Sequence, residues 1–128
     1  LWSSFILKSG GLKVFVGGDS GYDVSFQKIG QYAGGFDFAI LECGQYDAMW
    51  PNIHMMPEET IQAGIDLRAR TLMAVHWGKF KLANHTWTDP IERAYAKAGQ
   101  MEVPLAVPRL GETMRIDQPI FGQPWWKG

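Results

Sequence analysis

Cysteine is almost absent from this sequence. Cys43 is the single cysteine among 128 residues, so the chain cannot form an internal disulfide and has no Cys-x-x-Cys pair for a structural zinc ion. Cys43 follows an apolar segment and has no lysine or arginine near it in sequence, which favours a buried thiol over a reactive thiolate. This cysteine usage fits a reducing compartment, and we expect a cytoplasmic location.

Charge of one sign and long apolar runs are also lacking. The net charge is −1 and the basic residues are scattered, which excludes the electrostatic surface that nucleic acids require. The longest apolar runs, such as 36–41 and 71–75, are the length of strands, whereas a membrane span needs roughly 20 residues. We therefore expect no nucleic-acid partner and no transmembrane segment.

The chain also lacks an initiator methionine. It opens at Leu1, and residues 2–7 read as an apolar strand rather than as a leader. Hydrophobic residues make up 46% of the chain and charged residues 20%, which is typical of one globular unit with a core. We expect residues 1–128 to be part of a single domain that has been cut from a longer protein.

Short apolar segments alternate with segments of helical period, which predicts an α/β fold. A hairpin is expected around the turn 9–11, followed by a strand, helix, strand crossover. Strands are expected at 2–8, 12–16, 36–41 and 71–75, helices at 23–32, from Pro57 onward and at 91–98, with Gly99 as the last helix's stop. Segments 101–107 and 112–116 are predicted as closing strands, and 118–128 as an irregular tail.

Two predicted strands end next to a residue of a type that binds metals. Asp19 follows the strand 12–16, and His76 follows the strand 71–75. Ligands gather at the carboxyl edge of α/β sheets, a carboxylate can bridge two cations, and imidazole is a common zinc ligand. Gly17, Gly18 and Gly21 would let the backbone pass close to an ion. By residue type alone, however, Asp19 also suits a turn and His76 a structural role.

Three segments together resemble one family. They are 18–22 (GDSGY), 52–59 (NIHMMPEE) and 73–80 (MAVHWGKF). In order and spacing they resemble the second half of metallo-β-lactamase-fold hydrolases, in the branch of the N-acyl-phosphatidylethanolamine phospholipase D enzymes and related bacterial hydrolases. The resemblance implies a mixed sheet with flanking helices, the C-terminal half of an αββα sandwich. It implies that residues 1–128 lack the N-terminal half, which carries the motif His-x-His-x-Asp-His.

The resemblance also implies roles for three residues. Asp19 takes the place of the bridging aspartate and His76 that of the last metal-binding histidine, while His54 matches a histidine beside the metals. We assign His54 to the catalytic or substrate-binding shell, although a packing or capping role suits it equally from the residues alone. The implied cofactor is zinc, two ions in the full-length protein, with manganese or iron suited to the same ligands. The implied reaction is hydrolysis by metal-activated water, without a protein nucleophile.

The implied substrate is a small or lipid-like molecule with a phosphodiester or lactone bond. Trp50, Trp77 and Trp87 lie in or beside the loops that would surround the metals, where they could form an apolar wall or pack against helices. His85 lies in a polar loop and is expected to be solvated. The missing N-terminal half is an expected partner, and a homo-oligomer is compatible with the sequence.

Two other functions stay open from the sequence. A strand, Gly-rich loop, helix order also builds phosphate or nucleotide sites, although the loop carries Asp19 where a lysine would be expected. A non-catalytic scaffold that kept the fold without the first metal motif is the second alternative. Ser20 is a poor nucleophile candidate because the second glycine, Gly21, comes one position too early for a Gly-x-Ser-x-Gly elbow.

Overall fold

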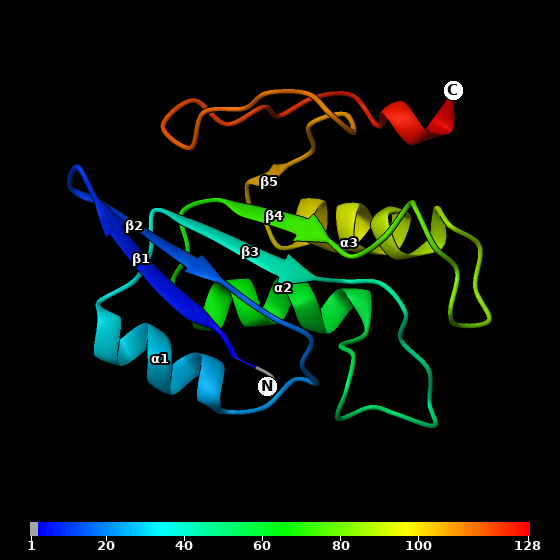
Figure 1. The fold of residues 1–128 in the computed structure, drawn as a ribbon, viewed down its shortest axis with the longest axis horizontal. Coiled ribbons are helices and arrows are strands. Elements are labelled where there is room, and N and C mark those ends of the chain that lie inside the picture. Colours follow the sequence, from blue (N-terminus) through cyan, green and yellow to red (C-terminus); the bar gives the residue numbers. More distant parts are fainter. Residues whose placement is uncertain (1–2) are drawn as a thin grey trace.

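A computed structural model describes residues 3–128, which form a five-stranded mixed sheet (Figure 1). The strand order is β1-β2-β3-β4-β5, in which β1 and β2 form an antiparallel hairpin and the remaining neighbours are parallel. The strands are β1 (Phe5–Ser9), β2 (Leu12–Val16), β3 (Phe38–Glu42), β4 (Leu72–Val75) and β5 (Leu105–Ala106). The predicted hairpin and crossover are confirmed, and Trp2 lies outside the described residues.

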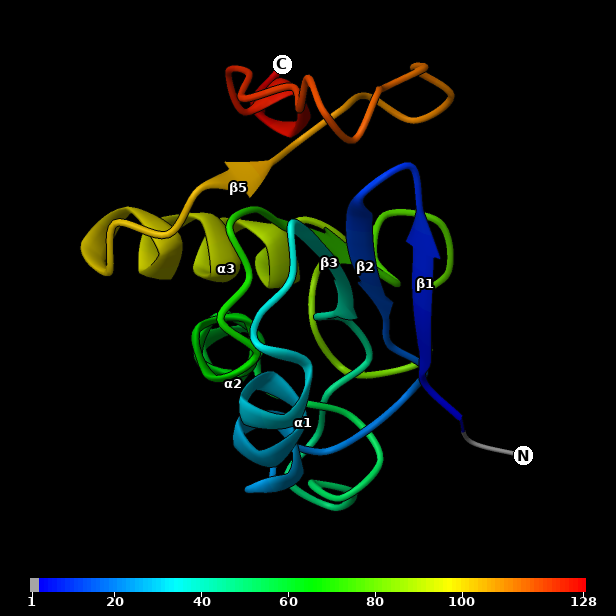
Figure 2. The same ribbon diagram turned by 90° about the vertical axis from the view of Figure 1, so that its left-hand side faces the viewer.

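Three helices connect the parallel strands and lie on one face of the sheet (Figure 2). They are α1 (Ser25–Ala33), α2 (Pro57–Asp66) and α3 (Asp89–Gln100), and a short 3₁₀ helix, η1 (Trp125–Lys127), lies near the C-terminus. Each crossover between parallel strands is right-handed by strong preference, and here the strands are added in one direction. Successive helices therefore cover the same face.

The main core lies between this sheet face and the helices. Phe15, Leu41, Ile61, Leu72 and Ile91 are almost fully buried there. Burying one side chain of this kind contributes about 1.5–3 kcal/mol, so the helix layer is held chiefly by apolar contact. Of residues 3–128, no helix is long and apolar enough to cross a membrane.

The opposite face of the sheet is much less covered. Its buried cluster contains only Val14, Phe38 and Ala106, with Met114 and Ile116 of the C-terminal segment packed against it. Residues directly opposite each other in an antiparallel pair share a face, and Phe5 pairs with Val16 and Leu7 with Val14. Phe5 and Leu7 are 60% and 56% exposed, so this face leaves a strip of apolar surface in water.

The predicted C-terminal strands were largely wrong. Of 101–107 only Leu105–Ala106 is a strand, because Pro104 has no N–H for the ladder. Segment 112–116 is not a strand but part of turns, since Glu112 closes back on Arg109 through two hydrogen bonds and Arg115 forms an isolated bridge with Gln118. Gly99 lies inside α3 rather than ending it, and α3 continues to Gln100.

Candidate metal centre

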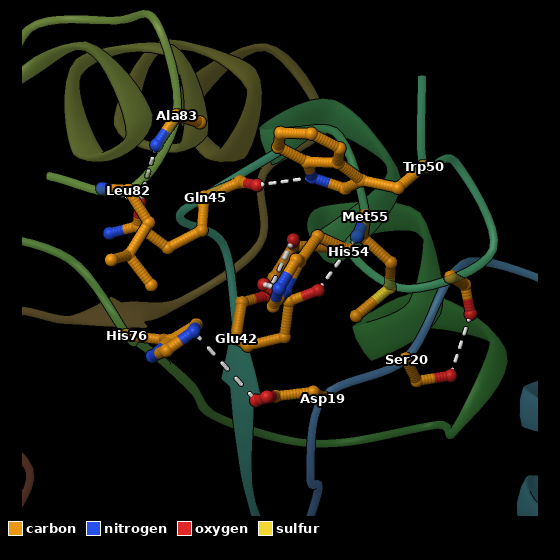
Figure 3. A network of polar contacts seen from close by, with 12 residues as sticks. Asp19, Ser20, Glu42, Gln45, Trp50, His54, Met55, His76, Leu82 and Ala83 are labelled. Atoms are coloured by element: carbon orange, nitrogen blue, oxygen red, sulfur yellow. Dashed lines mark hydrogen bonds and ion pairs between the residues drawn. The ribbon is translucent and has the colours of Figure 1, made fainter. Parts of the chain in front are cut away.

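The carboxyl ends of three neighbouring strands meet at one edge of the sheet. Asp19 follows β2, Glu42 is the last residue of β3, and His76 directly follows β4 (Figure 3). Asp19 Oδ1 lies 3.8 Å from His76 Nε2, so the two residues singled out from the sequence converge on the same rim. Parallel pairing of β2, β3 and β4 produces this proximity, because it aligns the strand ends.

The loop that carries Asp19 is fixed by close backbone packing. A Cβ on Gly18 would lie 2.9 Å from the Ser3 carbonyl oxygen, and one on Gly21 would lie 2.3 Å from the Pro51 carbonyl oxygen. The Gly21 N–H also donates to the Asn52 carbonyl at 3.1 Å. The glycines therefore permit approach of neighbouring backbone, rather than of an ion as the sequence suggested, and they join the Asp19 loop to the loop that precedes His54.

His76 leaves β4 in an unusual backbone conformation. Its φ is 67°, in the left-handed region, which costs a residue with a side chain about 1–3 kcal/mol. The chain then continues through Gly78, also with positive φ. A Cβ on Gly44 would lie 2.0 Å from the His76 carbonyl oxygen, so the loop after β3 packs directly against the backbone of His76. Such strain persists only where surrounding contacts enforce it.

His54 comes from the long loop between β3 and α2 and faces the same rim. Its ring centroid lies 5.2 Å from that of His76, and only 11% of its side chain is exposed. One potential ligand atom from each of Asp19, His54 and His76 lies within 4.8 Å of the others. Exposure rises from His54 through His76, at 36%, to Asp19, at 46%, so the cluster opens to solvent on the Asp19 side.

Glu42 is a fourth polar residue of this rim, and it was missed in the sequence. Its side chain is 2% exposed, with Oε1 accepting the Met55 N–H at 2.7 Å and Oε2 lying 3.4 Å from His54 Nδ1. Burial raises the pKa of Glu42 to about 8. The available signal was an acid at the end of an apolar strand, on the edge where Asp19 and His76 had already been placed.

Gln45 ties together the two loops that carry the histidines. It is buried and has a φ of 64°. Its side-chain oxygen accepts the N–H groups of Leu82 and Ala83, its side-chain amide donates to the Phe80 carbonyl, and its own carbonyl accepts the Trp50 indole N–H (Figure 3). The loop after β3 and the loop after β4 are thereby joined through one side chain.

Other residues weighed in the sequence lie outside this cluster. Cys43 is fully buried, and burial raises the pKa of its thiol, so it is inert as expected. Ser20 donates its hydroxyl to the Gly21 carbonyl. His85 is not a free loop residue, because it accepts the Gln45 N–H and stacks on Tyr46. Trp77 stacks with Trp87 and Trp125.

The donor set suits a divalent cation. Two ligand bonds of about 2.1 Å span at most about 4.2 Å, so the Asp19 and His76 atoms already lie at a separation that one cation can bridge. One carboxylate and two imidazoles are ligands that zinc accepts, and burial lowers the pKa of His54, which favours its neutral form. These residues therefore fit the zinc ion that the sequence resemblance implies.

Comparison with known proteins identifies that family. A model of the Beta-lactamase superfamily domain matches residues 1–77, a stretch that contains Asp19, His54 and His76. The chain belongs to the beta-lactamase superfamily. The α/β fold predicted from the sequence, of metallo-β-lactamase type with a mixed sheet and flanking helices, is confirmed.

Several relatives of this superfamily member are longer proteins. An uncharacterized protein of Mycobacterium tuberculosis is 40% identical over 130 residues, which cover 99% of this chain and 35% of that protein. The mitochondrial N-acyl-phosphatidylethanolamine-hydrolyzing phospholipase D of Saccharomyces cerevisiae is 34% identical over 124 residues, which cover 91% of this chain and 26% of the yeast protein. The chain thus spans about a third or less of the length of these relatives.

A solved structure shows the same fold. Igni18, a metallo hydrolase from the archaeon Ignicoccus hospitalis, superposes with a TM-score of 0.67 and 22% identity over 87% of this chain and 44% of Igni18. The superfamily match and this likeness together place the chain on a hydrolase fold that implies a metal cofactor.

Proposed function

We propose that this chain carries part of the active site of a metal-dependent hydrolase, in which Asp19 and His76 are metal ligands and His54 lies in the catalytic shell. The convergence of ligand atoms from these residues within 4.8 Å carries the proposal. Their elements are far apart in sequence, and a cluster of donors at the carboxyl edge of an α/β sheet is the common place for a site. In the full-length protein the centre would hold two zinc ions, with manganese or iron also suited to the ligands.

The side chains have separate tasks in this proposal. The Asp19 carboxylate, with two oxygens, would hold two ions at a fixed separation, and the His76 imidazole would fix one of them. When bound, the metal centre would activate a water molecule and polarise the bond to be cleaved. His54, largely buried beside His76, would orient the substrate and contact negative charge that develops during hydrolysis.

A phosphodiester is the substrate class we favour over a lactone. The similarity to a phospholipase D of yeast supports it. A pocket of about 220 Å³ beside His76 is lined by apolar groups such as Trp77, Val107 and Trp125, and also by Arg109. Such a lining suits a small or lipid-like molecule with an apolar part and an anionic part. Of Trp50, Trp77 and Trp87, which the sequence placed in loops near the metals, Trp77 lines this pocket.

We also propose that residues 1–128 are the C-terminal portion of one metallo-β-lactamase-type domain. The apolar strip around Phe5 and Leu7, on the face without helices, supports this arrangement, because a second sheet would bury it. The partner would be the N-terminal half of the same domain, with the remaining ligands. Strongly slowed hydrogen exchange of β1 and β2 in the full-length protein, relative to residues 1–128 alone, would support the proposal.

The metal assignment is tested by substitution in the full-length protein. Asp19→Asn and His76→Ala should each remove metal, measured by elemental analysis, and hydrolysis of phosphodiester substrates of graded chain length. Asp117→Asn and His85→Ala are matched controls, since both residues lie outside the cluster, and should retain metal. Unchanged metal content in the first two variants would contradict the assignment and favour a non-catalytic scaffold.

A further inference from the structure

Glu42 is a buried carboxyl group that the proposed reaction does not yet use. It closes β3 with 2% of its side chain exposed, directly behind the ring of His54 (Figure 3). Its Oε1 accepts the Met55 N–H at 2.7 Å. Its Oε2 lies 3.4 Å from His54 Nδ1, and both of these atoms are buried without a hydrogen-bond partner in the described chain.

Two orphaned polar atoms that face each other predict a hydrogen bond. A buried donor or acceptor left without a partner costs about 1–3 kcal/mol. A closer approach of a few tenths of an ångström, on the order of ordinary side-chain relaxation, would bring Oε2 and Nδ1 to hydrogen-bond distance. Either partner can supply the proton. In both cases Nδ1 is occupied and Nε2 is the ring nitrogen that stays available.

We propose that Glu42 is the positioning residue of His54. Its carboxyl group holds the ring through Nδ1 and the adjoining backbone through the Met55 N–H, so that Nε2 serves the site formed with Asp19 and His76. The expected effect of Glu42 on hydrolysis rests on the proposed function, whereas the contact between Glu42 and His54 does not.

The backbone of Glu42 explains why it can hold a loop residue in place. Glu42 pairs with Val75 in the sheet, one residue before His76. The Thr60 hydroxyl, from α2, donates to the Glu42 carbonyl at 2.8 Å. The carboxyl group is thus attached to a rigid strand end, while the residues it contacts belong to a long loop. Fixing His54 from the sheet sets its position relative to His76, which depends on the same strand pair.

A direct ligand role for Glu42 is less consistent with the geometry. The mutually close ligand atoms come from Asp19, His54 and His76, and Glu42 is not part of that group. One Glu42 oxygen is already occupied by a backbone N–H, and the other faces Nδ1. Carboxylates that hold the second nitrogen of a site histidine are common, and their loss costs about 10- to 100-fold in metal affinity or activity.

The test uses the full-length protein with Glu42→Gln, Glu42→Leu and, as a control, Thr60→Val. The control removes a buried hydrogen bond to the same strand end without touching His54. Nitrogen-15 NMR of the His54 side chain, recorded on metal-free protein, reports the bond at Nδ1. Elemental analysis of the zinc-loaded protein and steady-state kinetics with a phosphodiester complete the readouts.

We expect Glu42→Leu to shift the Nδ1 resonance and lower kcat by about 10- to 100-fold with KM nearly unchanged. The glutamine of Glu42→Gln can still accept the Met55 N–H and contact Nδ1 of His54. This variant should fold like the natural protein, with a kcat between those of the natural protein and Glu42→Leu. Zinc content should stay the same in all variants. Thr60→Val should leave the His54 resonances and the KM-to-kcat pattern unchanged.

Three results would overturn the inference. Loss of zinc in Glu42→Gln would show that Glu42 is a metal ligand. An unchanged Nδ1 resonance in both Glu42 variants would show that Glu42 and His54 form no hydrogen bond, and a loss of kcat in Thr60→Val equal to that in Glu42→Leu would show that the role of Glu42 is merely structural. The NMR result on metal-free protein stands apart from the proposed function. The NMR experiment would still decide whether Glu42 holds His54 even if the Asp19→Asn and His76→Ala variants kept their metal and the proposed function failed.

Discussion

The stability of the metal-free, full-length protein should decrease as the pH rises from 6.5 to 8, and Glu42 should be the cause. Burial is the main reason that the pKa of Glu42 is raised from 4.5 to about 8, and the charges of Asp19 and Glu59 act in the same direction. Between these two values the folded state holds a proton on Glu42 that the unfolded state has lost. The free energy of unfolding therefore falls with rising pH in this window and levels off above about 8.

The size of the loss in the free energy of unfolding follows from the pH interval over which it is measured. A difference of one bound proton changes the free energy of unfolding by about 1.4 kcal/mol per pH unit, so a rise from pH 6.5 to 8 should remove about 2 kcal/mol. His54 acts in the opposite direction. Burial lowers its pKa from the ordinary value of 6.5, so just above pH 6.5 the unfolded state binds more protons at His54 than the folded state, and His54 is present in both proteins compared below.

Urea denaturation followed by tryptophan fluorescence at several pH values provides the assay. Glu42→Gln has no ionisable group at this position and should lose about 2 kcal/mol less than the natural protein between pH 6.5 and 8. Glu92→Gln, at an exposed position of α3, is the control and should follow the natural protein. Parallel pH profiles for the natural protein and Glu42→Gln would refute the reasoning.

Three further outcomes are expected. Gly44→Ala should weaken zinc binding about tenfold or more, because the added Cβ would lie 2.0 Å from the His76 carbonyl oxygen. Gly99→Ala, with open space around the added Cβ, should bind zinc like the natural protein, and titration with zinc measures both affinities. Gln45→Ala should lower the free energy of unfolding by about 3 kcal/mol through three lost hydrogen bonds, and equal urea midpoints would contradict this. Metal-free His76→Gly should be about 1 kcal/mol more stable than His76→Ala, because alanine still bears the cost of the left-handed backbone; the reverse order would contradict that conformation.

The parts of the fold set by local pattern could be predicted from the sequence. The helix at Pro57 begins where a proline and acids favour a helix start, and Glu59 accepts the Met56 N–H there. The hairpin turn and the crossover follow from apolar runs between glycines, and the strand before His76 follows from the short apolar run 71–75. Proximity of Asp19 and His76 then follows from topology, because parallel strands align their carboxyl ends. Metal binding by these residues stays a prediction.

The parts that depend on distant contacts could not be predicted in this way. Segment 112–116 has the alternation of a strand, but Glu112 and Arg115 form local turns with Arg109 and Gln118 instead. Glu42 belongs to a residue type that is normally exposed, and its burial depends on the loop with His54 folding over it. Periodicity carries no information on the path of such a loop.

The rim is built for placement of side chains rather than for stability. Gln45 and His76 follow adjacent strands, and both have left-handed backbones although neither is glycine. Each such residue costs about 1–3 kcal/mol and is retained where contacts enforce it. Here Gln45 joins the two loops, and Gly44 packs on the His76 carbonyl, so the same contacts that maintain the strain also fix His76 beside Asp19. Glycine would form the turn after β4 without this cost, which supports our proposal that the imidazole of His76 has a function of its own.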